Sequence, residues 1–247
     1  MTDHEDWAAG DPLKEIPASV FADDDGSADA RLAQSLIRFS RGKAPLTEVV
    51  DSLAYARVLV PVVADGEGRI VGKHGLEQDH VASTGVVALQ AADGRMALPI
   101  FTDVDAMRAW NPGARPIPAE GPRAALAAAA EGWSILILNP GMETVLIPRP
   151  AVWALGKGEP WRPSVVDGAV TAEVKDAISD AIPVAGAVLA VDALPGRGAE
   201  VAVVLTLEPG LDRAALDDVV RDVHEALAAS AVIAERVDSL ELRLATA

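Results

Sequence analysis

The residues best placed for phosphate chemistry follow the first apolar run of the chain. There, Gly66 and Gly68 precede a Gly-Lys pair at 72–73, as in a strand that runs into a phosphate-binding loop. Such a loop needs four residues between its first glycine and the Gly-Lys pair, and then a serine or threonine. Gly66 leaves five residues, Gly68 leaves three, and His74 follows the lysine. The spacing does not match, and the segment is interpreted as a turn between strands.

A second group of residues has the chemistry to ligate a metal ion. Two imidazoles and two carboxylates lie within one short segment: His74, Glu77, Asp79 and His80. These ligand types suit zinc or manganese. Their spacing matches no established ligand pattern, and a charged surface loop produces such clusters by chance. We therefore predict neither a metal site nor a cofactor.

Two usual signs of a catalytic nucleophile are also missing. The 247 residues include no cysteine, which removes thiolate catalysis, disulfides and Cys-ligated metal centres. No Gly-x-Ser-x-Gly sequence, the marker of many serine hydrolases, occurs. The sequence therefore predicts no catalytic residue and a protein without enzymatic activity.

Apolar periodicity predicts the elements that position these residues. Residues 29–155 are expected to form a mixed α/β domain. Helices are predicted at 28–40, 45–54, 102–110 and 122–131, and strands at 57–63, 84–91, 95–101, 134–138 and 144–147. Residues 65–83 and 111–118 are interpreted as irregular segments.

Three local signals predict turns and a helix start in this domain. Asp93-Gly94 favours a hairpin. Residues 139–142, Asn-Pro-Gly-Met, suit a type II turn, with glycine at the position that needs a positive φ. Thr102 and Asp105 fit a capping box at the start of a short helix that ends at Trp110.

The last third of the chain predicts a second, smaller domain. A proline-rich stretch at 148–163 is typical of a linker, which we place at 156–169. Residues 170–247 then give a helix over 170–181, strands at 186–192 and 201–207, a helix that begins at Asp212, and a strand at 240–244. The order α-β-β-α-β predicts a sandwich with its helices on one face of the sheet. The fold class is therefore α/β, of the α+β kind, in two domains.

Charge is distributed unevenly along the chain. Of the net charge of −16, residues 1–28 carry −7 and form an acidic tail, residues 29–163 are neutral, and residues 164–247 carry −9. No cluster of lysine and arginine suggests a nucleic-acid partner. The acidic start differs from a signal peptide, and no apolar run approaches the ~20 residues of a membrane span. A cytoplasmic protein that binds neither nucleic acid nor membrane is expected.

Several short stretches resemble the N-terminal domain of SseB family proteins. The likeness extends over roughly residues 15–155 and rests on FADDDGSAD at 21–29, LPIFTDVD at 98–105 with Trp110, and LNPG at 138–141. ARP at 114–116 and RPAVW at 149–153 add to it. Residues 165–247 are similar in arrangement to the C-terminal domain of the family.

The resemblance implies no particular reaction, and the sequence itself combines the absence of a catalytic set with a neutral middle between acidic flanks. The family takes its name from an enhanced-serine-sensitivity phenotype, and no reaction is established for it as a class. We therefore predict a non-enzymatic interaction or regulatory protein that docks an unidentified protein partner or a second copy of itself. The alternative is a small-molecule sensor, with an amino acid as the suggested ligand.

Five residues are the candidates for a binding site: Phe101, Thr102, Trp110, Asn139 and Gly141. Packing of the short helix on the sheet and formation of a hairpin explain them as structural residues. As a site, they would gather at one edge of the sheet, where Thr102 and Asn139 would supply hydrogen bonds in an apolar groove. Both interpretations stay open at the level of sequence.

Overall fold

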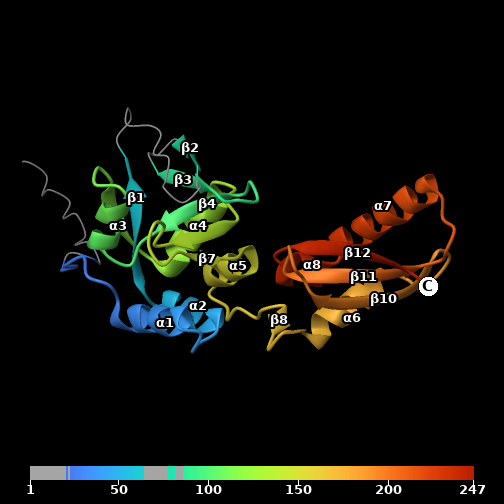
Figure 1. Ribbon diagram of the computed structural model, residues 1–247. Coiled ribbons are helices and arrows are strands. Elements are labelled where there is room, and N and C mark those ends of the chain that lie inside the picture. The colour runs from blue at the N-terminus through green and yellow to red at the C-terminus, as the bar shows by residue number, and fades with distance from the viewer. Residues whose placement is uncertain (1–20, 22, 64–76, 82–85) are drawn as a thin grey trace, which may run out of the picture.

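A computed structural model describes residues 21, 23–63, 77–81 and 86–247. Figure 1 shows two parts that lie side by side, and the chain crosses between them after helix α5 (Arg149–Lys157). Each part has its own sheet and its own hydrophobic core, and the architecture is α/β as the sequence predicts. Within these ranges no helix combines the length and the apolar character needed to cross a membrane.

The first part is a mixed sheet with helices around it. Its elements before α5 are α1 (Ala30–Ser40), α2 (Leu46–Leu53), β1 (Arg57–Val62), β2 (Glu77–Val81), β3 (Val87–Gln90), β4 (Met96–Ile100), α3 (Val104–Trp110), β5 (Arg115–Glu120), α4 (Gly121–Ala130), β6 (Ile135–Leu138) and β7 (Val145–Ile147). Strands β2, β3, β4, β6 and β7 form one sheet in that order, and β1 pairs with β5. Because β4 and β6 are parallel neighbours, their carboxyl ends meet at one edge of the sheet.

The core of this part lies between the sheet and four helices. Strand β6 contributes four apolar residues in a row, all buried, as expected of a central strand that is covered on both faces. Leu98 of β4, Leu53 of α2 and Val152 of α5 belong to the same cluster. Phe101 lies in a smaller cluster with Met107 of α3. The helices and the sheet are therefore held together by ordinary apolar packing.

The second part is a three-stranded sheet with helices on one face. Its elements are β8 (Val165–Val166), β9 (Ala169–Val170), α6 (Ala172–Ala181), β10 (Val188–Pro195), β11 (Val201–Leu207), α7 (Arg213–Ala229), α8 (Ala231–Arg236) and β12 (Leu240–Thr246). The order is β10-β11-β12, with β11 antiparallel to β10 and parallel to β12. Val201, Val203 and Leu205 alternate along β11, are fully buried, and pack with Val174 and Ile178 of α6.

The structure differs from the expected elements in both parts. Strand β2 includes residues 77–81 of the segment that was expected to be irregular, and β5 begins within the second such segment and occupies residues 115–118 of it. Helix α8 was not predicted. Helix α5 and the β8–β9 hairpin account for much of the proline-rich stretch and of the predicted linker at 156–169. Pro150 lies in the first turn of α5, where a missing N–H removes no helical hydrogen bond.

The start of α3 also differs from the expected capping box. The cap is Asp103, whose side chain accepts a hydrogen bond from the Ala106 N–H at 2.8 Å. Thr102 is therefore not the cap, and the prediction was wrong by one residue. The Thr102 side chain is instead used in a contact with Asn139.

The end of the predicted acidic tail lies against the first part. The Asp24 carboxylate forms an ion pair with Arg57 of β1, with 2.8 Å between Oδ2 and Nε. The carbonyl of Gly26 accepts a hydrogen bond from the Val104 N–H at 3.0 Å. These contacts fix the chain just before α1 onto β1 and α3. Residues 1–20 and 22 lie outside the described residues.

Candidate functional site

The five predicted binding residues come together at one edge of the first sheet. Phe101 follows β4 and Asn139 follows its parallel neighbour β6, so the topology places them side by side. The rings of Phe101 and Trp110 lie 5.3 Å apart between centroids, at an interplanar angle of 40°. A Cβ on Gly141 would lie 3.8 Å from Cδ1 of Trp110. The five residues therefore lie close together in the structure.

The polar groups of this cluster bind one another. The Thr102 N–H donates to Oδ1 of Asn139 at 3.0 Å, and Nδ2 of Asn139 donates to Oγ1 of Thr102 at 3.1 Å. The Thr102 hydroxyl also donates to Oδ2 of Asp103 at 2.7 Å. Phe101 is 0 % exposed and Thr102 is 4 % exposed. The cluster joins the ends of β4 and β6 to α3, and a binding role for it stays a prediction.

The turn after β6 has the predicted form. The Met142 N–H donates to the Asn139 carbonyl at 3.2 Å, which closes the four-residue turn. Gly141 has a φ of 85°, the conformation that a type II turn requires at this position. Asn139 itself has a φ of 51°, which non-glycine residues adopt rarely and asparagine more readily than most.

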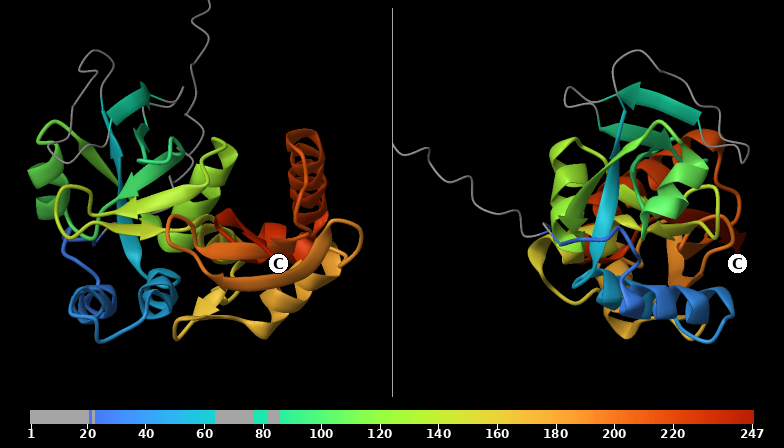
Figure 2. Two further views of the ribbon diagram at one scale, coloured as in Figure 1. Left: turned by 45° about the vertical axis from the view of Figure 1, so that its right-hand side comes forward. Right: turned by 90° about the vertical axis from the view of Figure 1, so that its left-hand side faces the viewer.

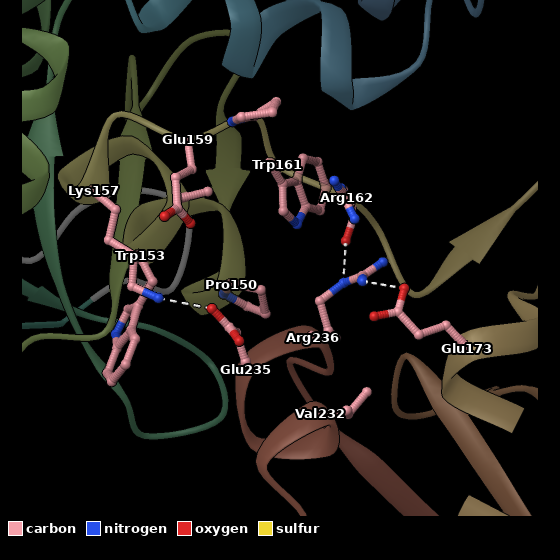
Figure 3. Close-up of a pocket in the computed structure, with 12 residues that line it drawn as sticks. Pro150, Trp153, Lys157, Glu159, Trp161, Arg162, Glu173, Val232, Glu235 and Arg236 are labelled. Atoms are coloured by element: carbon pink, nitrogen blue, oxygen red, sulfur yellow. Dashed lines mark hydrogen bonds and ion pairs between the residues drawn. The ribbon is translucent and has the colours of Figure 1, made fainter. Parts of the chain in front are cut away.

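A second candidate site lies at the junction between the two parts (Figure 3). It is a cavity of about 310 Å³. Its lining comes from α5, the connecting segment at 158–164, α6 and α8: Pro150, Trp153, Ala154, Lys157, Glu159, Pro160, Trp161, Arg162, Glu173, Val232, Glu235 and Arg236. We call this cavity the junction cleft. It combines two indole rings with side chains of both charges.

Ion pairs form the floor of the junction cleft. Lys157 of α5 contacts Glu235 of α8 at 2.7 Å between Nζ and Oε1, which joins the two parts. The hydrogen bond from Lys157 lowers the pKa of Glu235, and the same bond raises the pKa of Lys157. Arg236 of α8 donates to Glu173 of α6 at 2.5 Å and to the Arg162 carbonyl at 3.1 Å. Figure 3 shows the contact between Lys157 and Glu235 at the left and the two contacts of Arg236 at the right.

Trp161 has a polar atom that the described residues leave without a partner. Its ring packs against the core of the first part, and Nε1 is buried with no hydrogen-bond partner. In Figure 3 this nitrogen faces the interior of the cleft, toward Arg236. An unsatisfied buried donor costs about 1–3 kcal/mol, so such groups are rare. Ser164 and Thr171, just beyond it in the chain, also have buried and unpartnered hydroxyl oxygens.

A buried carboxylate fixes the two parts beside the cleft. Asp238, between α8 and β12, accepts hydrogen bonds from both terminal nitrogens of the Arg95 guanidinium at 2.8 and 3.0 Å. The same carboxylate accepts the Arg149 N–H at 3.0 Å. The hydrogen bonds with Asp238 raise the pKa of Arg95 above its ordinary value, so the guanidinium stays charged. Bidentate pairs of this kind are strong and geometrically specific.

Arg149 adds a second contact across the junction. Its guanidinium donates to the carbonyls of Ala234 and Val237 at 2.5 Å each. These carbonyls lie at the end of α8, where a helix leaves its last acceptors without intrahelical partners. Arg149 is also the first residue of α5, so one residue ties the helix that borders the cleft to the second part.

Sequence reasoning missed the junction cleft because it assigned this segment to a linker. One signal was present, since two tryptophans lie among lysine, glutamate and arginine within residues 153–162. Of the four candidate metal ligands, His74 lies outside the described residues, and the other three belong to β2, whose side chains are not described. In the part of the chain that the structure describes, no three His, Asp or Glu side chains come close enough to hold a metal ion.

Comparison with known proteins identifies the first part. Residues 32–154 match the family model described as the SseB protein N-terminal domain. No curated protein and no solved structure matches the chain. The matched range runs from α1 into α5 and contains the complete five-stranded sheet and the Phe101–Asn139 cluster. On this match, the chain belongs to the SseB family.

Proposed function

We propose that this protein is a non-enzymatic regulatory protein that binds a small zwitterionic molecule, an amino acid or a short peptide, in the junction cleft. One observation carries the proposal. The Nε1 donor of Trp161 is buried, has no partner among the residues that the structure describes, and faces a cavity that is lined by charged groups of both signs. A small shift of the indole ring would bring this donor to a ligand in the cleft, and the hydrogen bond would remove the cost of the unsatisfied donor.

The charges in the cleft favour a zwitterion over a simple anion or cation. Among the described residues, the side chains of Glu159 and Arg162 line the cleft outside the ion pairs of its floor. Glu159 offers a carboxylate for an ammonium group. Arg162 offers a guanidinium for a carboxylate, with the Trp161 N–H as a second donor. The volume of about 310 Å³ lies at the small end of the range of roughly 300–1,000 Å³ for ligand pockets.

The position of the cleft supports a regulatory role. Its walls come from helices of both parts, so a bound ligand would contact α5, α6 and α8 together. A ligand that binds one arrangement of two domains more tightly than another shifts the population toward that arrangement. A protein partner that binds one domain arrangement better than the other would respond to this shift. The sensing role would then be connected to the predicted interaction role.

A thermal-shift screen against amino acids and dipeptides tests the proposal. A ligand at a hundred times its dissociation constant adds about 2.7 kcal/mol of stability. For a chain of this length that corresponds to a rise in Tm of about 5–10 °C. Trp161→Phe keeps an aromatic ring and removes the N–H, and Arg162→Gln removes an exposed charge. Both variants should lose the shift, measured against their own unliganded Tm.

The matched control is Tyr55→Phe, because Tyr55 is an aromatic residue that is 82 % exposed and does not line the cleft. It should keep the full shift. A screen with no shift for any amino acid or dipeptide contradicts the proposal. A shift that survives Trp161→Phe but is lost in Asn139→Ala would place the ligand at the Phe101–Asn139 cluster instead.

A further inference from the structure

Strand β12 is the edge of the second sheet, and half of its backbone groups point outward. The Val201 N–H donates to the Ser239 carbonyl at 3.2 Å, and the Ala247 N–H donates to the Leu207 carbonyl at 3.3 Å. With the parallel register of β11 and β12, odd-numbered residues of β12 therefore face β11. The N–H and C=O groups of the even-numbered residues face the other way. In the described part of the chain no further strand pairs with β12.

The sequence of β12 is complementary to itself. Its first five residues are Leu-Glu-Leu-Arg-Leu, centred on Leu242. When two copies pair antiparallel about this centre, Leu242 opposes its own copy and Leu240 opposes Leu244. These even-numbered residues are the ones whose backbone groups point outward. Glu241 then opposes Arg243 in the non-hydrogen-bonded positions, where side chains of an antiparallel pair come closest.

Charge selects this register over its neighbours. Only registers that oppose even residues to even residues use the outward backbone groups, so the alternatives are shifts of two residues. One shift opposes Glu241 to Glu241, and the other opposes Arg243 to Arg243. Like charges directly opposite each other destabilise a strand pair, whereas opposite charges stabilise it. The pairing centred on Leu242 is therefore the favoured one.

The apolar face of β12 also extends beyond the part that the core covers. Leu240 and Leu242 are partly buried against the core, but Leu244 at the far end is 46 % exposed. Figures 1 and 2 show α7 rising away from the sheet at this side, and Leu216 and Val219 of α7 are only partly buried. An uncovered edge with an apolar face is a template for another strand. A second copy would cover both the strand edge and the exposed apolar side chains.

We propose that two copies of this chain associate through β12, in antiparallel register about Leu242, to form one continuous six-stranded sheet. The contact is isologous, since each surface meets its own copy across a two-fold axis. It is separate from the junction cleft, so the dimer and the ligand proposal stand or fall independently. At this interface Glu241 of each copy lies opposite Arg243 of the other copy.

The mass of the protein in solution tests the dimer. Sedimentation velocity of the full chain over a hundredfold range of concentration should show a mass that rises to twice 25.6 kDa. Leu244→Pro removes an N–H that points outward, which an edge strand tolerates, and should give a monomer at every concentration. Thr246→Pro is the matched control, because it removes an outward N–H beyond the paired residues and should keep the dimer.

An unchanged circular dichroism spectrum of Leu244→Pro shows that its fold is intact. A wild-type chain that stays monomeric at all concentrations overturns the proposal, as does a dimer that Leu244→Pro leaves unchanged.

A single cysteine gives a second test that does not depend on proline. Because the chain has no cysteine, a disulfide in a one-cysteine variant can form only between copies. In this register the two Leu242 Cα atoms lie about 5.5 Å apart, within the range that a disulfide spans. Leu242→Cys should oxidise to a covalent dimer, and Leu194→Cys on the opposite edge strand should not. Cross-linking of Leu194→Cys alone would assign the interface to β10 and overturn the proposal.

Discussion

Removal of the Asp238 carboxylate should uncouple the two parts of the molecule. This carboxylate accepts two hydrogen bonds from Arg95 and one from the Arg149 N–H, all across the junction. Its side chain is 11 % exposed and that of Arg95 is 28 % exposed. Asp238→Ala therefore leaves a partly buried guanidinium whose remaining charged partner, among the described side chains, is the exposed Asp93.

The size of the effect follows from these contacts. A hydrogen bond to a charged group contributes about 1.5–3 kcal/mol, and breaking a fully buried ion pair costs about 3–5 kcal/mol. Arg95 keeps its contact with Asp93 and gains access to water, which offsets part of the loss. We expect Asp238→Ala to lower the free energy of unfolding by about 3 kcal/mol.

Two spectroscopic signals separate the parts in a urea titration. All five tryptophans lie at or before residue 161, so fluorescence reports on the first part and the junction, whereas far-UV circular dichroism reports on both parts. In the wild-type chain the two transitions should coincide. In Asp238→Ala they should separate, because the remaining junction contacts of Arg149, Lys157 and Arg236 stabilise the two parts less than the complete set does.

The control for this experiment is Glu235→Ala. It breaks the ion pair with Lys157, which also crosses the junction but has side chains that are 45 % and 52 % exposed. Exposed pairs contribute about 0–1 kcal/mol, so its transitions should still coincide. Coincident transitions in Asp238→Ala, with a free energy within about 1 kcal/mol of the wild-type value, would refute the role of Asp238 in the junction.

Three further predictions concern single residues. In Gly121→Ala the new Cβ would lie 2.0 Å from the Leu53 carbonyl oxygen, so the backbone must move, and urea unfolding should show a loss of about 3 kcal/mol. Asn139→Ala removes the acceptor of the Thr102 N–H and leaves an alanine at a positive φ, which should cost about 2–3 kcal/mol in the same assay. The pKa of Glu241 is lowered from 4.5 to about 2, first by the Gly198 N–H and then by two further hydrogen bonds. Its stabilisation is therefore complete above pH 4.5 and is lost as the pH falls toward 2, and Tm measured against pH should vary less over this interval in Glu241→Gln.

Elements with strong local signals could be predicted from the sequence. Helix α7 begins after Asp212, whose side chain accepts a hydrogen bond from the Ala215 N–H, and the apolar stripe that follows has helical spacing. The large apolar residues at the odd-numbered positions of β11, from Val201 to Leu207, repeat with the period of a strand and are buried. In both cases the information lies within a few residues of the element.

Elements that depend on distant partners could not be predicted in this way. Strand β5 contains Pro116 and Pro118, which argue against a strand, but within the described residues it pairs with β1 alone, and the edge that this leaves tolerates proline. Helix α5 was hidden by Pro148 and Pro150, since the same residues that break a helix interior also suit its first turn. The junction cleft was missed for the same reason.

For the predicted binding cluster, the sequence could predict which residues lie close together but not which hydrogen bonds they form. Parallel strands end at the same edge, so the proximity of Phe101 and Asn139 follows from topology. The hydrogen bonds by which Thr102 and Asn139 satisfy each other depend on side-chain positions that a sequence does not contain. The same is true of the unpartnered Trp161 donor.

The most direct test of the proposed ligand site is the indole region of a ¹⁵N-labelled NMR spectrum. Five tryptophans give five indole N–H signals, and Trp161→Phe and Trp110→Phe assign the two that matter. Addition of an amino acid that raises Tm should move the Trp161 signal in a saturable way and leave the Trp110 signal in place. A Trp161 signal that stays fixed while the Trp110 signal moves would contradict binding in the junction cleft.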